Sequence, residues 1–83
     1  MCIFMDSHEK VDGLTAEAVA GAHARDCEVQ EKHGVKYLKY WFNERTGRMY
    51  CLVEAPNAEA ARAVHQEAHG LVADEVVEVH EGS

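Results

Sequence analysis

Six histidines and three cysteines in a chain of 83 residues give this sequence an unusual density of side chains that can bind a metal ion. His65 and His69 are four residues apart in a segment with helical periodicity. Their Cβ atoms should lie about 5–6 Å apart on one helix face, where both imidazoles can chelate one ion. Glu67 stands at the wrong position for the HExxH motif of metalloproteases, which excludes that chemistry. Two solvated surface histidines are the alternative to a chelating pair.

A second group of polar residues falls on the apolar face of the segment after Thr15. Asp26 lies in the middle of that face and His23 at its border. A carboxylate there is costly unless it is paired, so we expect Asp26 to bond a buried tyrosine hydroxyl or a histidine. With about 1.5 Å per helical residue and about 3.3 Å per strand residue, His23, His65 and Cys51 lie at similar depths. These three side chains converge if Cys51 faces the helices.

A third group lies where two strands are expected to end. Asp6 and His8 are two residues apart and therefore point to the same side of their strand. Glu54 is expected near the same edge, and an ion pair or a cap at the strand end is the alternative reading. His33 and His80 lie near the ends of elements and are expected to be solvated.

The cysteines, at positions 2, 27 and 51, are odd in number and form no CxxC motif. In a reducing compartment they should be free thiols, and Cys51 has the surroundings of a small buried hydrophobe. A catalytic thiol needs cationic surroundings, which this acidic chain does not offer. No serine stands in a nucleophile motif, so the sequence predicts no catalytic residue.

The charge of the chain limits its partners. With 15 acidic and 8 basic residues the formal net charge is -7, which argues against nucleic acids and anionic membranes and attracts divalent cations. Met49–Val53 is as long an unbroken apolar stretch as any, far short of a membrane span. Met1–Asp6 lacks the basic region of a signal peptide, so we expect a cytosolic protein. No linker or repeat interrupts the sequence, so we expect one domain over residues 1–83.

The order of strand and helix patterns predicts a βαββαβ chain. Thr15 and Asn57 are the expected N-caps of the two helices, because both side chains can accept a backbone N–H. Gly34 and Gly70 are the expected helix stops, and Asn43–Gly47 has the composition of a hairpin loop. The expected elements are a strand at 2–8, a helix from 16 to about 33, strands at 35–42 and 48–55, a helix at 58–69 and a strand at 75–79.

This order predicts a ferredoxin-like α+β sandwich, in which two helices cover one face of an antiparallel sheet. The first and third strands are expected as central neighbours that run parallel. The other sheet face stays uncovered, and Tyr37 and Trp41, or their neighbours of opposite parity, must lie on it. A large bare apolar face indicates a partner, so we expect a homodimer that packs sheet to sheet.

Several segments of the chain match the motifs of a known family. They are Phe4-Met5-Asp6-Ser7-His8, Ala22-His23 with Asp26, Tyr50-Cys51-Leu52-Val53-Glu54-Ala55-Pro56, His65, Ala68-His69-Gly70 and Ala73-Asp74-Glu75-Val76. Over nearly the whole chain, the sequence resembles a family of small bacterial nickel-binding proteins that was long catalogued as a domain of unknown function. The resemblance implies a ferredoxin-like homodimer that binds nickel on its surface and acts in nickel sequestration or detoxification.

The leading hypothesis is a protein that binds a divalent metal ion for sequestration or homeostasis, in preference to an enzyme. Imidazole and carboxylate ligands suit Ni²⁺, Zn²⁺ or Cu²⁺, and the choice of nickel comes from the resemblance. Solvent would complete an octahedral shell, and binding should weaken as the pH falls through the histidine range. The expected ligands are His65, His69, His23, His8, Asp6 and Glu54.

Two other functions stay open. Fold analogy allows a small dimeric α/β-barrel enzyme acting on a small organic substrate, with His23, Asp26 and Tyr50 as acid–base candidates. A deep closed cavity lined by His23 and Asp26 would favour that enzyme, whereas histidine clusters at the surface would favour metal binding. A regulatory or assembly module, whose bare sheet pairs with a different protein, is the third possibility, and monomeric behaviour in solution would support it.

Overall fold

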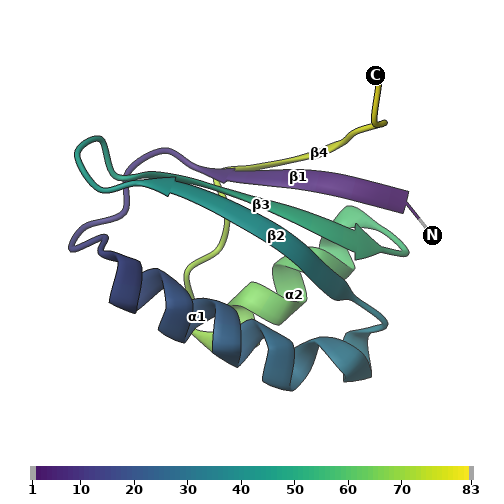
Figure 1. Ribbon diagram of the computed structural model, residues 1–83. Coiled ribbons are helices and arrows are strands. Elements are labelled where there is room, and N and C mark those ends of the chain that lie inside the picture. The colour runs from purple at the N-terminus through teal and green to yellow at the C-terminus, as the bar shows by residue number, and fades with distance from the viewer. Residues whose placement is uncertain (1, 83) are drawn as a thin grey trace.

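A computed structural model describes residues 2–82 (Figure 1). The chain forms a four-stranded sheet with the strand order β2-β3-β1-β4, and both α-helices lie on one face of it. The βαββαβ order and the ferredoxin-like α+β fold are thereby confirmed. The elements are β1 (Cys2–His8), α1 (Ala16–Val29), the 3₁₀ turn η1 (Gln30–His33), β2 (Lys36–Asn43), β3 (Arg48–Ala55), α2 (Ala58–Ala68) and β4 (Glu75–Glu78).

All strand pairings in the sheet are antiparallel, including that of the central strands β1 and β3. The expectation that β1 and β3 run parallel is wrong. Helix α1 returns the chain so that β2 runs in the direction of β1, and the hairpin loop then reverses the chain into β3 (Figure 1). The register places Cys2 opposite Ala55 and His8 opposite Met49, so β3 accompanies β1 over its whole length.

Both helices begin at the residues that the sequence predicted. Thr15 Oγ1 accepts the N–H of Ala18 at 3.1 Å, and Asn57 Oδ1 accepts the N–H of Ala60 at 2.8 Å. The last turn of the first helical segment is 3₁₀, and Gly34 ends it with a φ of 69°, a left-handed conformation that favours glycine. Within residues 2–82, neither helix has the length and hydropathy that a membrane crossing requires.

Strand β2 contains a bulge that decides which of its aromatic side chains face the helices. The register with β3 shifts between Tyr37 and Lys39, which makes Leu38 an extra residue on β2. Tyr37 faces the helices and is 5% exposed, whereas Trp41 lies on the open face and is 48% exposed. Strict alternation would have put both rings on one face. After the bulge, Tyr40 instead turns to the helix side.

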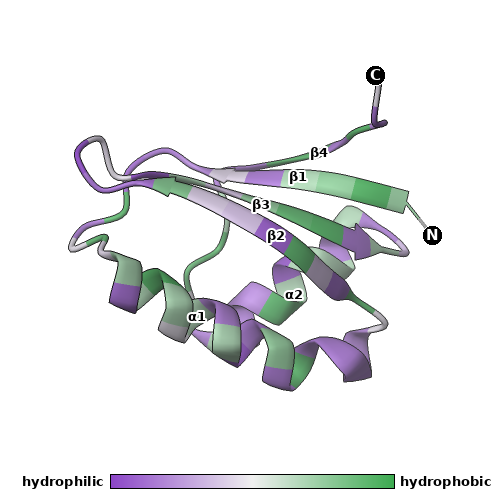
Figure 2. Cartoon of the chain, in the orientation of Figure 1, coloured by the Kyte–Doolittle hydropathy of each residue, from purple (hydrophilic) through white to green (hydrophobic). Residues whose placement is uncertain are grey.

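The layer between the sheet and the helices holds an apolar core that also contains buried polar side chains. Figure 2 shows hydrophobic residues along β1 and β3, and hydrophilic residues in the β2–β3 loop and at the end of α1. Asp6, His8, Asp26 and His65 are buried in this layer although each carries polar atoms, and each of them therefore requires a partner. The apolar members include Phe4, Val19, Val35, Tyr37, Met49, Val53, Ala61 and Val64.

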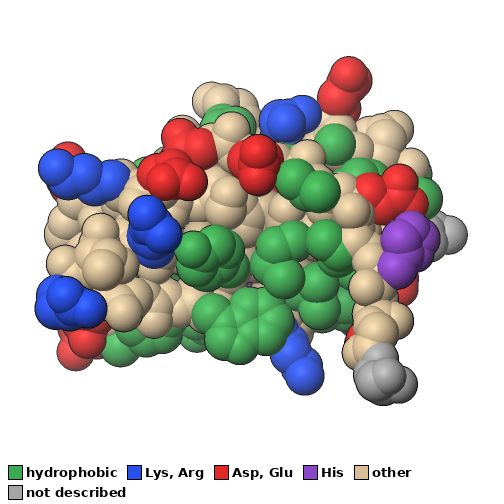
Figure 3. Space-filling view, turned by 90° about the horizontal axis from the view of Figure 1, so that it is seen from above, with side chains coloured by type: hydrophobic (Ala, Val, Ile, Leu, Met, Phe, Trp, Pro, Cys, Tyr) green, Lys and Arg blue, Asp and Glu red, His purple; other side chains and the backbone are tan. Residues whose placement is uncertain are grey.

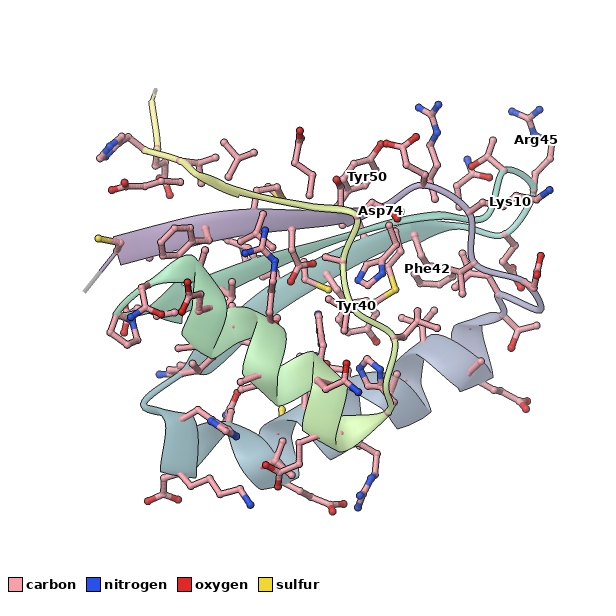
Figure 4. The ribbon with its side chains drawn as sticks, turned by 180° about the vertical axis from the view of Figure 1, so that it is seen from behind. Lys10, Tyr40, Phe42, Arg45, Tyr50 and Asp74 are labelled. Atoms are coloured by element: carbon pink, nitrogen blue, oxygen red, sulfur yellow. The ribbon has the colours of Figure 1, made fainter. Side chains whose placement is uncertain are left out.

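The opposite face of the sheet is uncovered and carries a hydrophobic patch (Figure 3). The exposed side chains of Leu38, Trp41, Tyr50 and Val77 contribute to this patch. Figure 4 shows that Tyr50 points away from the helices, while Tyr40 points toward them. The bare apolar face that the fold class predicted is therefore present.

Candidate metal centre

Strand β1 carries two polar side chains into the layer between sheet and helices. Asp6 and His8 point to the helix side, as their spacing of two residues predicted, and are 0% and 4% exposed. Cys51 on β3 lies directly opposite Asp6 and is also buried. The condition that Cys51 should face the helices is met.

Helix α2 places His65 in the same layer, where it is 1% exposed. Its Nε2 lies 3.0 Å from Asp6 Oδ2, and its Nδ1 lies 2.9 Å from Asp26 Oδ1. Because Asp26 belongs to α1, the His65 ring connects β1, α1 and α2. His65 is therefore a buried histidine of the kind that the sequence required as a partner for Asp26.

His69, one turn further along the chain, approaches the same carboxylate. The backbone N–H of Leu71 donates to His69 Nδ1 at 3.1 Å. This leaves the ring proton of a neutral His69 on Nε2, which lies 3.1 Å from Asp26 Oδ1 and donates to it. His65 and His69 thus lie side by side, as their spacing predicted, and both converge on one oxygen of Asp26.

The charges of this network stabilise one another. Burial disfavours the imidazolium form of His65, but the carboxylates of Asp26 and Asp6 outweigh it and raise the pKa of His65 to about 9. Burial also disfavours the charged form of Asp26, yet hydrogen bonds from His65 and His69 lower the pKa of Asp26. Near neutral pH His65 is therefore a buried cation held between two carboxylates.

The hydroxyl of Tyr37 completes the surroundings of one Asp6 oxygen. It lies 3.2 Å from Asp6 Oδ2 and 3.1 Å from the carbonyl oxygen of Ala61, and its proton can be donated to either. Burial, together with the Asp6 and Asp26 carboxylates, raises the pKa of Tyr37, so the hydroxyl stays a neutral donor. The sequence had suggested a tyrosine hydroxyl or a histidine beside Asp26. The structure places histidines there and the tyrosine beside Asp6.

Two buried polar atoms have no hydrogen-bond partner among the described residues. They are Asp6 Oδ1 and His8 Nε2, which lie 3.7 Å apart. Burial lowers the pKa of His8 more than the nearby Asp6 carboxylate raises it, so the ring is neutral and makes no ion pair. Unsatisfied buried polar atoms are rare in folded proteins and call for an explanation such as an ion or a water.

The surrounding donor set fits a transition-metal ion. Asp6, His8, Cys51 and His65 each offer a ligand atom, and these atoms all lie within 4.8 Å of one another. Two ligands that are each about 2.1 Å from one ion lie roughly 3–4 Å apart, which spans the distance between the two unpartnered atoms. Imidazole, carboxylate and thiolate ligands together suit borderline ions such as Ni²⁺, Zn²⁺ and Cu²⁺.

Cys51 is the member of this cluster that was not among the expected ligands, although its convergence with His65 was expected if it faced the helices. Burial raises the pKa of its thiol, and the neighbouring Asp6 carboxylate raises it further. A buried protonated thiol is what the sequence predicted. Its position next to Asp6 depends on the register between β1 and β3. Only a correct prediction of that register would have identified Cys51 as a neighbour of Asp6.

The structure places two of the expected ligands away from this cluster. Glu54 is half-buried and alternates with the helix-facing residues Val53 and Ala55, so it lies on the other side of β3. It is also not at the edge expected for it, because the antiparallel register pairs it with Ile3, toward the opposite end of β1 from His8. His23 lies on α1 against the ring of Tyr40, with a centroid distance of 4.8 Å.

The other two histidines lie near the surface. His33 is not simply solvated, because its Nε2 lies 3.0 Å from a Glu67 oxygen. The side chain of His80 is 88% exposed, as expected.

The arrangement expected for the enzymatic alternative does not form around its three candidate residues. Tyr50 lies on the open face of the sheet, whereas His23 and Asp26 lie on α1 on the helix side. A pocket of about 210 Å³ opens beside His69, but its lining is mainly apolar and includes neither His23 nor Asp26. The three proposed acid–base groups therefore do not share one site.

Comparison with known proteins finds relatives over nearly the whole chain. Residues 4–79 match a family described as nickel-responsive protein, SCO4226-like. The chain belongs to the SCO4226-like family. A solved structure of a SCO4226-like protein, described as the crystal structure analysis of SCO4226 from Streptomyces coelicolor A3(2), has the same fold with a TM-score of 0.90. The two sequences are 37% identical, and the match covers 98% of this chain and 99% of that one. No curated protein matches this SCO4226-like chain.

Proposed function

We propose that this chain binds a divalent transition-metal ion, Ni²⁺ foremost, at the buried cluster of Asp6, His8, Cys51 and His65. The observation that supports this most directly is the pair of unpartnered atoms, Asp6 Oδ1 and His8 Nε2, 3.7 Å apart in the core. Membership of a nickel-responsive family supports nickel over the other ions that suit the same ligands. Zn²⁺ and Cu²⁺ can compete with Ni²⁺ for this site, because the same ligand types suit all three ions.

Each residue of the cluster has a distinct part in this proposal. Neutral His8 and ionised Asp6 offer free lone pairs, whereas His65 must first lose the Nε2 proton that it shares with Asp6. The Nδ1–H of His65 continues to donate to Asp26 Oδ1. This hydrogen bond fixes the tautomer of the ring and orients its Nε2 toward the ion. Cys51 becomes a ligand when it loses its proton.

His69 is proposed to support the ion from outside the ligand shell. Asp26, His65 and His69 form a second group whose ligand atoms are close together, but it shares His65 with the first group. The Asp26 oxygen and both His69 nitrogens already take part in hydrogen bonds. His69 therefore positions Asp26 through a hydrogen bond, and Asp26 positions His65 in the same way. His23 and Glu54 have no part in this site.

The burial of the ligands favours sequestration as the role of the site. Asp6, Cys51 and His65 are each at most 1% exposed, so an ion can exchange only when the surrounding structure opens locally. A site of this kind retains an ion better than it passes one rapidly to a partner. We propose a role in metal sequestration or homeostasis on this ground.

The proposed assembly is a homodimer through the open sheet face. The exposed side chains of Leu38, Trp41, Tyr50 and Val77 form a patch on one side of a chain whose helices cover only the other side. Burial of such a patch against a second copy removes apolar surface from water and requires no other protein.

Calorimetric titration of the metal-free protein with Ni²⁺ tests the proposed site. We expect one tight site per chain, and we expect His8→Ala to weaken binding by a factor of 10 or more, on the order of known ligand-shell changes. His80→Ala, which removes a fully solvated histidine, is the matched control and should leave the affinity unchanged. Equal affinities for His8→Ala and the unaltered chain, with both folded by circular dichroism, would rule out the buried cluster.

A further inference from the structure

A pair of metal-ligating side chains lies on α1, outside the buried cluster. Cys27 follows His23 by four residues, and its Sγ lies 3.6 Å from His23 Nε2. Cys27 is exposed and His23 is half-buried, so both atoms can be reached from solvent. Neither residue contributes to the groups formed around His65.

The His23 ring is held in place by the neighbouring strand. It packs against Tyr40 with the ring planes tilted by 42°. Tyr40 faces α1 because the bulge at Leu38 shifts the parity of β2 (Figure 4). A ring that is already positioned loses less conformational entropy when it binds a ligand.

The spacing of the two atoms allows both of them to bind one ion. With metal–sulfur and metal–nitrogen distances of about 2.3 and 2.05 Å, a tetrahedral angle places the two ligand atoms about 3.6 Å apart. A right angle, as in an octahedral site, would bring them to about 3.1 Å at the same bond lengths. The 3.6 Å between Cys27 Sγ and His23 Nε2, at which the thiol and the imidazole can hydrogen-bond, is close to the tetrahedral value, so one ion can bind both atoms with little movement of the side chains.

We propose that His23 and Cys27 form a second, surface metal site that takes tetrahedral, thiophilic divalent ions such as Zn²⁺ or Cd²⁺. Binding forms one metal–sulfur and one metal–nitrogen bond, releases the thiol proton to solvent and leaves the other two positions to water. No redox step is involved. This site shares no residue with the buried cluster, so the two sites can bind ions independently.

Protection of Cys27 from alkylation tests the proposal. The full-length protein, kept reduced with a phosphine, is treated with N-ethylmaleimide at increasing Zn²⁺ concentrations, and labelling of each cysteine is followed by peptide mass spectrometry. The labelling rate of Cys27 should fall by a factor of 1 + [Zn²⁺]/Kd, about tenfold near nine times the Kd. His80→Ala should behave like the unaltered chain.

Two variants separate this site from the other possibilities. His23→Ala should weaken the protection of Cys27 by Zn²⁺ while leaving its labelling without metal measurable, because the chelating partner is lost. His8→Ala, which disrupts the buried cluster, should keep the protection, so the two sites can fail independently. Absence of protection, or equal protection with and without His23, would overturn the proposal.

Discussion

At the scale of single residues, the centre is organised around one imidazole ring. His65 lies between Asp6 and Asp26, with its two nitrogens 3.0 and 2.9 Å from their oxygens. In the metal-free protein it is the cation that lies between two buried carboxylates and offsets part of their negative charge. The proposed ion takes over that role beside Asp6, while Asp26 continues to orient the ring.

Removal of the Asp26 carboxylate should weaken metal binding although Asp26 is not a proposed ligand. In Asp26→Asn the acceptor for the Nδ1 proton of His65 becomes weaker, so the ring is less firmly aimed at the ion. We expect the Ni²⁺ affinity to fall about 10–100-fold in calorimetric titration, the range known for such outer partners. Asp12→Asn, an exposed carboxylate, is the control. An affinity in Asp26→Asn that equals the control would refute the orienting role.

The Tyr37 hydroxyl should contribute to stability through Asp6. Tyr37→Phe keeps the ring that stacks on His65 but removes the donor 3.2 Å from Asp6 Oδ2. We expect the free energy of unfolding in urea to fall by about 1–3 kcal/mol, the usual effect of removing a hydrogen bond to a buried charged group. Tyr50→Phe alters a hydroxyl on the exposed face and should change it by less than about 0.5 kcal/mol. Similar losses in both variants would show that the Tyr37 bond contributes little.

At the scale of elements, the site depends on the register of strands and on the depth of helices. The sequence predicted the caps at Thr15 and Asn57, the turn at Gly34 and the shared face of Asp6 and His8, because each follows from local chemistry or from a period of two. It also marked Asp26 as a residue that requires a partner. These local signals were enough to predict the βαββαβ fold.

The remaining features arise from long-range pairing that local patterns do not encode. The bulge at Leu38 separates Tyr37 from Trp41, and nothing in the alternation of β2 marks it. Cys51 joins the cluster because it is paired with Asp6 across two strands. His23 packs against Tyr40, the residue of β2 that pairs with Cys51, but its ring does not join the cluster, since depth along a helix does not determine the direction of a side chain.

The N-cap of α2 should influence the site through the helix that carries His65. Asn57 Oδ1 accepts the N–H of Ala60, so Asn57→Ala leaves a helix donor without its partner. We expect the free energy of unfolding to fall by about 1 kcal/mol in urea titration. Asn57→Asp, which restores an acceptor at the same position, should recover most of that loss. A variant with alanine that is as stable as the one with aspartate would contradict the capping role.

At the scale of the whole molecule, the buried charges make stability depend on pH. A group whose pKa is raised on folding stabilises the protein below its unfolded pKa, and this stabilisation is lost as the pH rises through the folded value. The pKa of His65 rises from 6.5 to about 9. The metal-free protein should therefore lose stability between about pH 6.5 and 9, by on the order of 3 kcal/mol.

Other titrating groups change how stability depends on pH above and below this range. The raised pKa of the Cys51 and Tyr37 side chains extends the loss to higher pH. The lowered pKa of His8 acts in the opposite direction, because unfolding lets that ring take up a proton below about pH 6.5. Urea unfolding at pH 7, 8 and 9 in the presence of a chelator measures the balance. A free energy of unfolding that stays constant or rises over this range would contradict the charge state assigned to His65.

The uncovered sheet face should determine the oligomeric state. We expect light scattering to give the mass of a dimer for the unaltered chain and that of a monomer for Trp41→Lys, because a buried lysine at the centre of an apolar interface is unfavourable. Val72→Lys changes a side chain of similar exposure in the segment after α2 and should remain dimeric. A monomeric unaltered chain would instead support a different partner for this face.

We propose above all that a metal ion binds between Asp6, His8, Cys51 and His65 in the core. Crystals of the protein grown with Ni²⁺, measured at the nickel absorption edge, test it most directly, because an anomalous peak locates the ion without reference to affinity. We predict a peak within about 2.5 Å of both Asp6 Oδ1 and His8 Nε2, in the range of metal–ligand bonds. Nickel peaks found only beside surface histidines such as His33 or His80, with the buried cluster unchanged, would contradict it.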